Sequence, residues 1–344
     1  MELSDRKLKI LSAVVDSYVQ TGEPVSSKTL CNVLDFSASS ATIRNELAEL
    51  TELGFLEQPH TSAGRIPSHL GYRLYINKLM GKVSLSNKTK NYIDSSLNSK
   101  LISPEAILKE AVNLLSQITN FAVISTNISS YSNFIKNIQL VKIGNFSAMI
   151  ILSTSSGIIK NQLFKCDYLL SDEIINKICN ILNTNFTGVP VNDVTPAFIQ
   201  TIAVSLGEFA FMMSDIFAVL LNLSEQISKI NIHLDGQINL LSIPNINQKS
   251  VINVINLFND SEDIYNLFLP ENKNKTRIFI GEETHYDELS QSSIIITRYH
   301  TNNEIHGSIG IVGPTRMNYA TSIAKLEYIA SSIGEILNHL LNIE

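Results

Sequence analysis

The stretch that most constrains this chain runs from residue 37 to residue 72, with the sequence SASSATIRNELAELTELGFLEQPHTSAGRIPSHLGY. Within it, apolar side chains recur at i, i+4 and i+7, a spacing that places them on one narrow face of a helix. These side chains are Ile43, Leu47 and Leu50. Gly54 can end that helix in the left-handed conformation, and an extended segment then begins at Phe55. The stretch therefore predicts a short helix, a glycine stop, and two strands joined by a basic turn.

The amino end of this helix and the face opposite its apolar side chains carry small or hydrogen-bonding residues. Side chains of this kind allow a helix to approach base edges in the major groove of DNA. The residues that we expect to contact DNA from this helix are Ser39, Ser40, Ala41, Thr42, Arg44 and Asn45. An ordinary solvated helix face has the same composition, so the helix alone does not decide between the two interpretations.

The flanking segments favour DNA binding. A second short helix is expected over residues 25–34, with Ser26 or Ser27 as its N-cap, and residues 35–37 form a connection of helix-turn-helix length. After the helix that begins near Ser39, a polar hairpin turn adds further candidate contacts. These candidates are Thr61, Ser62 and Arg65. Two helices followed by a β-hairpin, in this order, are typical of a winged helix-turn-helix domain.

The distribution of charge supports the same interpretation, although the net charge of −6 does not. No Asp or Glu occurs between residues 58 and 93, where the positive residues cluster. They are Arg65, Arg73, Lys78, Lys82, Lys88 and Lys90. A local basic surface matters more for nucleic-acid binding than the total charge does. Arg73 therefore joins the expected DNA contacts, whereas the part of this run beyond Lys82 is more typical of a solvated linker.

The run EPVSSKTL at residues 23–30 and the run from Ser39 to Ile76 resemble HrcA, the family of heat-inducible transcription repressors of bacteria. IGEE at residues 280–283 and GPTRMNY at residues 313–319 are also similar to the pattern of that family. The resemblance spans the chain and is weakest in the middle third. It implies a homodimeric repressor of chaperone operons that binds an inverted-repeat operator in double-stranded DNA. It also implies that a GroEL-type chaperonin of the GroE system maintains the repressor in its active form.

The expected fold is a multidomain α+β protein. Residues 1–80 form the winged helix-turn-helix domain, beginning with a helix from Ser4 to Gly22, and residues 81–103 form a polar linker. The resemblance implies that residues 104–170 and 229–344 form a GAF-like domain. It also implies that the mainly helical segment 171–228 is an inserted dimerisation domain. The apolar stripe expected at that interface is Leu206, Phe209, Met213, Phe217 and Leu220. The alternative is a helix buried within its own subunit.

Composition excludes several other classes of protein. The apolar run from residue 202 to 223 contains Glu208 and Asp215, which are costly within lipid, so we expect no membrane contact. The three cysteines form no CxxC pair and the first residues form no secretion signal, which predicts a cytoplasmic protein. The seven histidines include no HExxH motif, and no P-loop is present, so we expect no enzyme, metal or cofactor.

Two alternatives to a chaperonin-controlled repressor remain open. A GAF-like domain could bind a small ligand, which would make the protein a metabolite-responsive regulator. An enzyme carrying an accessory winged helix is disfavoured by the missing catalytic motifs. For GPTR at residues 313–316, we expect a turn from strand to helix with Thr315 as the cap, although an effector site is the alternative.

Overall fold

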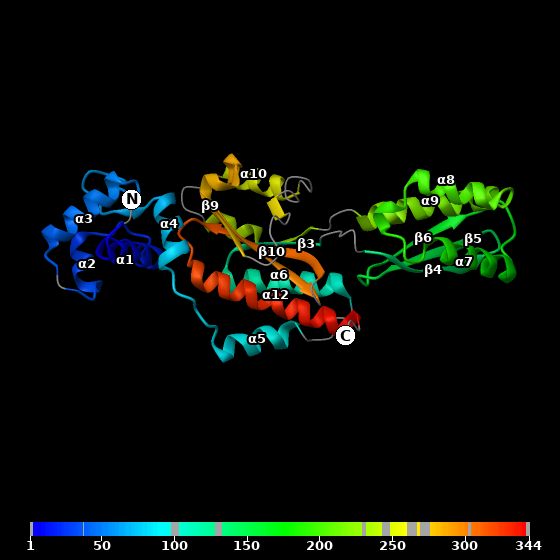
Figure 1. Ribbon diagram of the computed structural model, residues 1–344, viewed down its shortest axis with the longest axis horizontal. Coiled ribbons are helices and arrows are strands. Elements are labelled where there is room, and N and C mark those ends of the chain that lie inside the picture. Colours follow the sequence, from blue (N-terminus) through cyan, green and yellow to red (C-terminus); the bar gives the residue numbers. More distant parts are fainter. Residues whose placement is uncertain are drawn as a thin grey trace.

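The computed structural model describes residues 3–36, 38–97, 103–127, 133–228, 232–242, 248–259, 267–268, 276–301 and 304–341. The molecule is elongated, with an N-terminal domain at one end, a central domain and a distal module at the other end (Figure 1). The described residues form three β-sheets, of two, five and three strands. This arrangement confirms the expected multidomain α+β architecture.

The N-terminal domain consists of three helices followed by a short antiparallel hairpin. Its elements are α1 (Asp5–Thr21), α2 (Ser27–Val33), α3 (Ser40–Glu52), β1 (Leu56–Glu57) and β2 (Ile66–Pro67). The helix α1 begins and ends where predicted: Ser4 caps it by accepting from the backbone N–H of Lys7, and Gly22 ends it, in the left-handed conformation. The apolar stripe of α3 is buried, also as predicted, and packs in one core with α1.

The chain leaves this domain through α4 (His69–Leu74), which continues as a π-helix, η1 (Tyr75–Leu79). The expected linker of residues 81–103 contains a helix, α5 (Asn87–Leu97). Ile93 and Leu97 of α5 are fully buried, and the Tyr328 hydroxyl donates to the Asp94 carboxylate. This part of the expectation was wrong, because two apolar residues four positions apart are enough to anchor an otherwise polar helix.

The central domain is a five-stranded sheet between helices. Its elements are α6 (Pro104–Thr119), β3 (Ala122–Asn127), β7 (Ile232–Asp235), η3 (Gln237–Ser242), α10 (Gln248–Asn259), β8 (Arg277–Ile280), η4 (Gly281–Thr284), η5 (Asp287–Leu289), β9 (Ser292–Thr301), β10 (Glu304–Pro314) and α12 (Tyr319–Leu341). The strand order is β7-β3-β10-β9-β8, and each described pairing is antiparallel. Because alternate residues of a strand face opposite sides, one sheet face packs on α6 and α12 and the other on α10.

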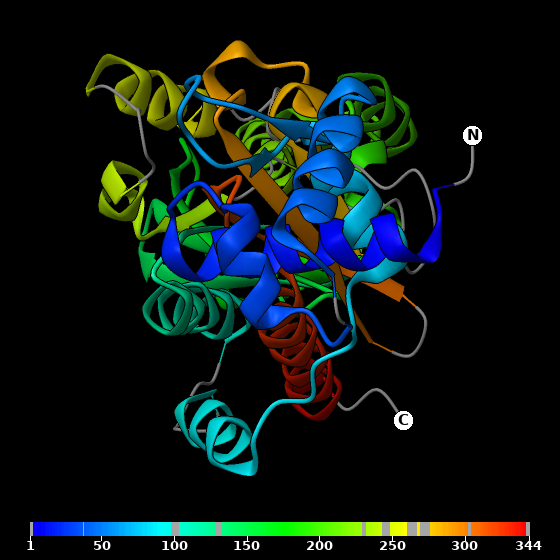
Figure 2. The same ribbon diagram turned by 90° about the vertical axis from the view of Figure 1, so that its left-hand side faces the viewer.

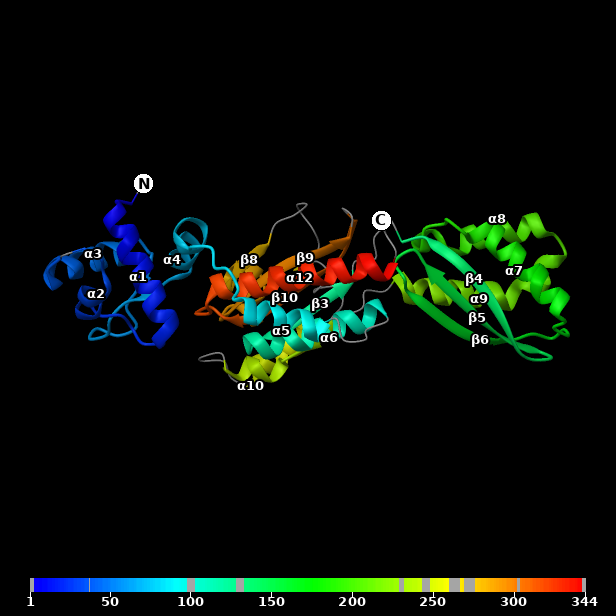
Figure 3. The ribbon, with the colours of Figure 1, turned by 90° about the horizontal axis from the view of Figure 1, so that it is seen from below.

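The distal module is inserted between β3 and β7 and has its own core (Figure 3). It contains β4 (Ile135–Gly144), β5 (Ser147–Thr154), β6 (Ile159–Lys165), α7 (Asp172–Phe186), η2 (Val191–Asp193), α8 (Pro196–Leu206) and α9 (Phe209–Ser228). The expected insertion at 171–228 was therefore too short, since the described module begins at residue 133. The segment 171–228 is itself mainly helical, as expected, but α7 and α9 bury their apolar faces against one face of the β4-β5-β6 sheet, which precedes it in the chain.

The stripe expected to form a dimer interface lies largely within this core. Met213, Phe217 and Leu220 are 0%, 5% and 0% exposed, whereas Leu206 and Phe209 are only partly buried. The three buried residues are unavailable to a second chain, because an amphipathic helix on a sheet turns its apolar face inward. Among the described residues, one helix, α9, is long and apolar enough to cross a membrane, but its buried side chains pack on the sheet.

Candidate nucleic-acid interface

Helix α3 begins with a side-chain cap that uses two of the expected contact residues. The Ser39 hydroxyl accepts from the backbone N–H of Thr42 at 3.0 Å and lies 2.8 Å from the Thr42 hydroxyl. Replacing such a cap by alanine costs about 1 kcal/mol of helix stability. Ser39 and Thr42 therefore stabilise the first turn of α3, at the end where Ala41 and Arg44 lie exposed.

A second contact fixes α3 against α2. The hydroxyl groups of Ser27 and Ser40 are 2.9 Å apart, although the two residues come from different helices. The outward face of α3 then presents Ala41, Arg44 and Asn45 to solvent. Three of the expected residues of α3 are therefore exposed on a helix that packs against α2, within the N-terminal domain that faces the viewer in Figure 2.

Two of the three acidic residues of α3, Glu46 and Glu49, form ion pairs with α1. Glu46 lies 3.4 Å from the Arg6 guanidinium and 3.3 Å from the Lys7 ammonium, and Glu49 lies 2.8 Å from the same ammonium. A hydrogen bond to Glu49 and, to a smaller extent, one to Glu46 raise the pKa of Lys7. These pairs leave the exposed amino-terminal half of α3 without a competing carboxylate from its own helix.

The hairpin between β1 and β2 places its candidate residues differently from the expectation. Thr61 and Ser62 are exposed at the tip, where the Gln58 amide donates to the Thr61 carbonyl. Arg65 lies at the base of the hairpin, and its backbone exchanges two 2.8 Å hydrogen bonds with Val25. The Arg65 Nε also donates to the Thr51 hydroxyl of α3 at 2.9 Å. Arg65 therefore joins the hairpin to α3 and to the segment that precedes α2.

Arg73, an expected DNA contact, lies against the central domain. Its Nε donates to Glu283 Oε1 at 2.9 Å, and its Nη2 binds Glu283 Oε2 and donates to the Ile278 carbonyl at 2.7 Å. The guanidinium is thus engaged by the central domain, which lies 205–210 residues further along the chain. Lys28, which was not among the expected contacts, is exposed at the amino end of α2. Its position two residues after the Ser26 cap could have indicated it.

Comparison with known proteins identifies the family. A family model described as "HrcA protein C terminal domain" matches residues 105–323. The chain belongs to the HrcA family. The heat-inducible transcription repressor HrcA of Acetivibrio thermocellus is 33% identical, with 99% of this chain and 98% of that protein covered. The repressor of the same name from Thermoanaerobacter pseudethanolicus is also 33% identical, and both chains are covered over their full length.

A solved structure shares the fold. The crystal structure of a hypothetical protein at 2.2 Å resolution aligns with a TM-score of 0.67 and 24% identity. The alignment covers 98% of this chain and all of that chain. The arrangement of N-terminal domain, central sheet and distal module in this HrcA chain therefore also occurs in a second protein.

Proposed function

We propose that this HrcA protein is a transcriptional repressor of heat-shock chaperone operons and that it binds an inverted-repeat operator as a homodimer. The observation that carries the proposal is the exposed face of α3, where Ala41, Arg44 and Asn45 stand clear of the domain core. The names of the relatives support the assignment to heat-inducible genes.

In this proposal the N-terminal domain is a winged helix-turn-helix. Helix α3 enters the major groove, where Arg44 can donate to guanine and Asn45 can pair with adenine. Lys28, at the amino end of α2, would meet a phosphate, and the hairpin tip at Thr61 and Ser62 would follow the neighbouring backbone. The 2.9 Å contact between Ser27 and Ser40 keeps α2 and α3 at a fixed crossing during binding.

The role of Arg65 can be separated from its structural contact with Thr51. Arg65→Ala should weaken binding to all duplexes and lower the slope of log affinity against log salt by about one unit. Thr51→Val removes the hydroxyl that accepts from Arg65 but keeps the charge, so it should leave the slope unchanged. Titrations at several salt concentrations check both variants. An unchanged slope for Arg65→Ala would restrict Arg65 to holding the hairpin against α3.

A homodimer is proposed because one such domain buries too little surface for tight, specific binding. The distal module offers an open sheet face on the side away from its helices. Val141, Met149 and Leu163 are cross-strand neighbours on that face. The large apolar side chains exposed on these strands are Val141, Ile143, Ile159 and Leu163, at 39%, 59%, 63% and 61%. An exposed apolar surface of this kind favours pairing with a second copy.

We further propose that a GroEL-type chaperonin maintains the active form. Phe211 is 84% exposed and Val204 is 77% exposed, outside the sheet face assigned to the dimer. Exposed apolar side chains make an unpaired subunit prone to aggregate. Operator affinity then falls with the fraction of protein that is competent, and a tenfold loss of that fraction resembles about 1.4 kcal/mol of weaker binding.

Operator titrations after mild heating test the chaperonin proposal. The active fraction should fall on heating and recover with chaperonin and ATP, whereas chaperonin without ATP serves as the control. Full activity without chaperonin, and no response to it, would contradict the proposal. The central domain would then be examined as a GAF-like site for a small ligand, which is the alternative mode of control.

A further inference from the structure

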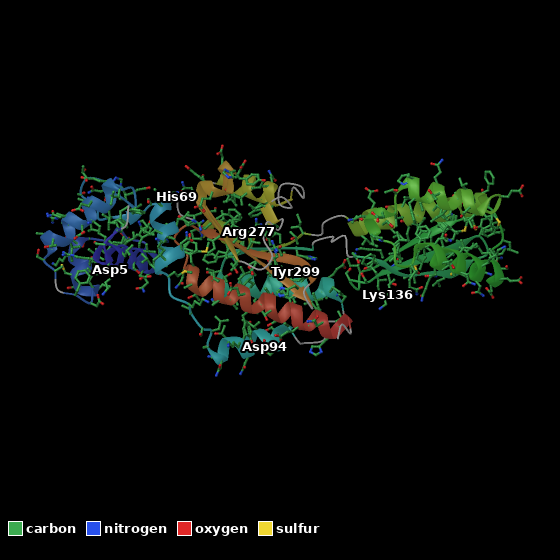
Figure 4. All side chains as sticks on the ribbon, in the orientation of Figure 1. Asp5, His69, Asp94, Lys136, Arg277 and Tyr299 are labelled. Atoms are coloured by element: carbon green, nitrogen blue, oxygen red, sulfur yellow. The ribbon has the colours of Figure 1, made fainter. Side chains whose placement is uncertain are left out.

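The two carboxy-terminal motifs of the sequence, at residues 280–283 and 313–316, meet the N-terminal domain. Figure 4 labels His69 where α4 of the N-terminal domain reaches the central domain. The apolar core continues across this boundary, because side chains of α1 and α3 belong to the same buried cluster as those of α6 and α12. The N-terminal domain is therefore held on the central domain by packing as well as by the connecting chain. We call this contact between the domains, which involves residues 69–73, 280–283 and 313–319, the seat.

The first polar contact of this seat joins Arg73 to Glu283. Both carboxylate oxygens of Glu283 are bound by the guanidinium, and Glu283 Oε2 also accepts from the backbone N–H of Ile280 at 2.9 Å. The Ile278 carbonyl accepts a further bond from Arg73. A two-pronged contact between guanidinium and carboxylate fixes direction as well as distance. Because the backbone N–H of Ile280 fixes the Glu283 carboxylate, Arg73 is bound in one orientation.

A second contact places the Arg316 guanidinium at the carboxyl end of α1. Gly22 adopts a left-handed conformation with φ of 73°, and a Cβ added there would overlap the Arg316 guanidinium. The last turn of α1, a helix that the structure describes in full, contains no basic residue. A cation near the carboxyl end of a helix offsets the partial negative charge of its free carbonyl groups. Arg316 thus supplies from the central domain a charge that α1 lacks.

Between these two contacts the side chains pack closely, so the N-terminal domain has little freedom to change its orientation on the central domain. A Cβ on Gly281 would overlap the ring of His69, and the rings of Tyr72 and Tyr319 lie 5.9 Å apart. Tyr319 is 2% exposed, and its hydroxyl accepts from the Ser293 hydroxyl 2.7 Å away, because its own proton is donated to the Thr315 carbonyl. Thr315, expected as a helix cap, instead accepts from the Tyr319 hydroxyl through its carbonyl, and Asn318 caps α12. The GPTR turn therefore belongs to the seat.

We propose that Arg73, Glu283 and Arg316 are positioning residues that set the half-site spacing accepted by the dimer. This role rests on the proposed function, in which two copies pair through their distal modules. In such a dimer the separation of the two α3 helices depends on how each N-terminal domain is held on its central domain. None of the three residues belongs to the exposed α3 face, so they act on operator choice through orientation.

Spacer variation tests the proposal. The probes are a single half-site and inverted repeats whose spacers differ in steps up to half a helical turn, about 5 base pairs. Wild-type protein should lose about tenfold or more in affinity when the spacer is changed by that half turn. Arg73→Ala and Arg316→Ala should lower affinity for the best spacer and reduce the penalty to about threefold or less, while binding the half-site normally.

Two further variants complete the design. Lys78→Ala removes one exposed positive charge from the neighbouring π-helix without altering the seat, so it should keep the wild-type spacer profile. Glu283→Gln keeps the shape of the side chain and should behave as Arg73→Ala does, which guards against a folding defect in one variant. A wild-type spacer profile in the seat variants would overturn the inference, as would weaker half-site binding in all of them. If wild-type protein bound no inverted repeat better than a half-site, the proposed dimeric repressor would fail instead.

Discussion

Replacing Leu163 by aspartate should convert the protein into folded monomers and lower its affinity for a full inverted repeat by about 10²- to 10⁴-fold. Leu163 lies on β6, directly across from Met149, and is 61% exposed in the single chain. In the proposed dimer the new carboxylate would be buried without a partner, which is strongly unfavourable. Sedimentation gives the association state, circular dichroism reports whether the variant is folded, and operator titration gives the affinity.

Phe211→Asp is the matched control for this experiment. Phe211 is also a large exposed side chain of the distal module, but it lies on α9 in the helical layer. The same charge placed there should leave both the dimer and its operator affinity unchanged. A folded Leu163→Asp variant that remains dimeric would contradict the assignment of the sheet face. Monomers of Phe211→Asp would move the interface to the helical layer.

Arg44→Ala and Asn45→Ala should each reduce the preference for operator over random DNA by about 1–3 kcal/mol, or roughly 5- to 150-fold. Both side chains are exposed on the outward face of α3, where lost base contacts would affect the specific site alone. Competition between labelled operator and random duplex measures the ratio directly.

Glu52→Ala provides the control within the same helix. Glu52 is exposed at the last residue of α3, so its removal should strengthen binding to both duplexes by a similar factor and leave the ratio unchanged. If Arg44→Ala or Asn45→Ala lowered the affinity for both duplexes equally, the assigned contacts would be to phosphate and not to bases.

Local sequence rules were sufficient for the elements of the N-terminal domain. The burial of Ile43, Leu47 and Leu50 follows from their spacing. Helix α1 begins after its cap residue Ser4 and ends at the left-handed Gly22. Each of these features depends on residues within a few positions of one another. For this reason they could be predicted without knowledge of the rest of the chain.

Long-range contacts explain where the structure differs from the expectations. Arg73 looked like a DNA contact because it lies in an acid-free run, but its partner Glu283 is 210 residues away in the sequence. The apolar stripe through Met213 and Phe217 indicated a buried helix face without indicating what covers it. The strands β4 to β6 alternate in the same way whether they join the central sheet or form another one. Only the packing of α7 and α9 on them assigns them to the distal module.

The most direct test of the proposed function is a footprint of the purified protein on DNA from upstream of the chaperone operons of its own genome. We expect two protected half-sites related by two-fold symmetry, with centres about 10 base pairs apart or a multiple of that distance. At the concentration at which wild-type protein half-protects the operator, Arg44→Ala should give clearly weaker protection of both half-sites. Protection of a single unrepeated segment, or equal protection of random DNA, would contradict a dimeric repressor that reads an inverted repeat through α3.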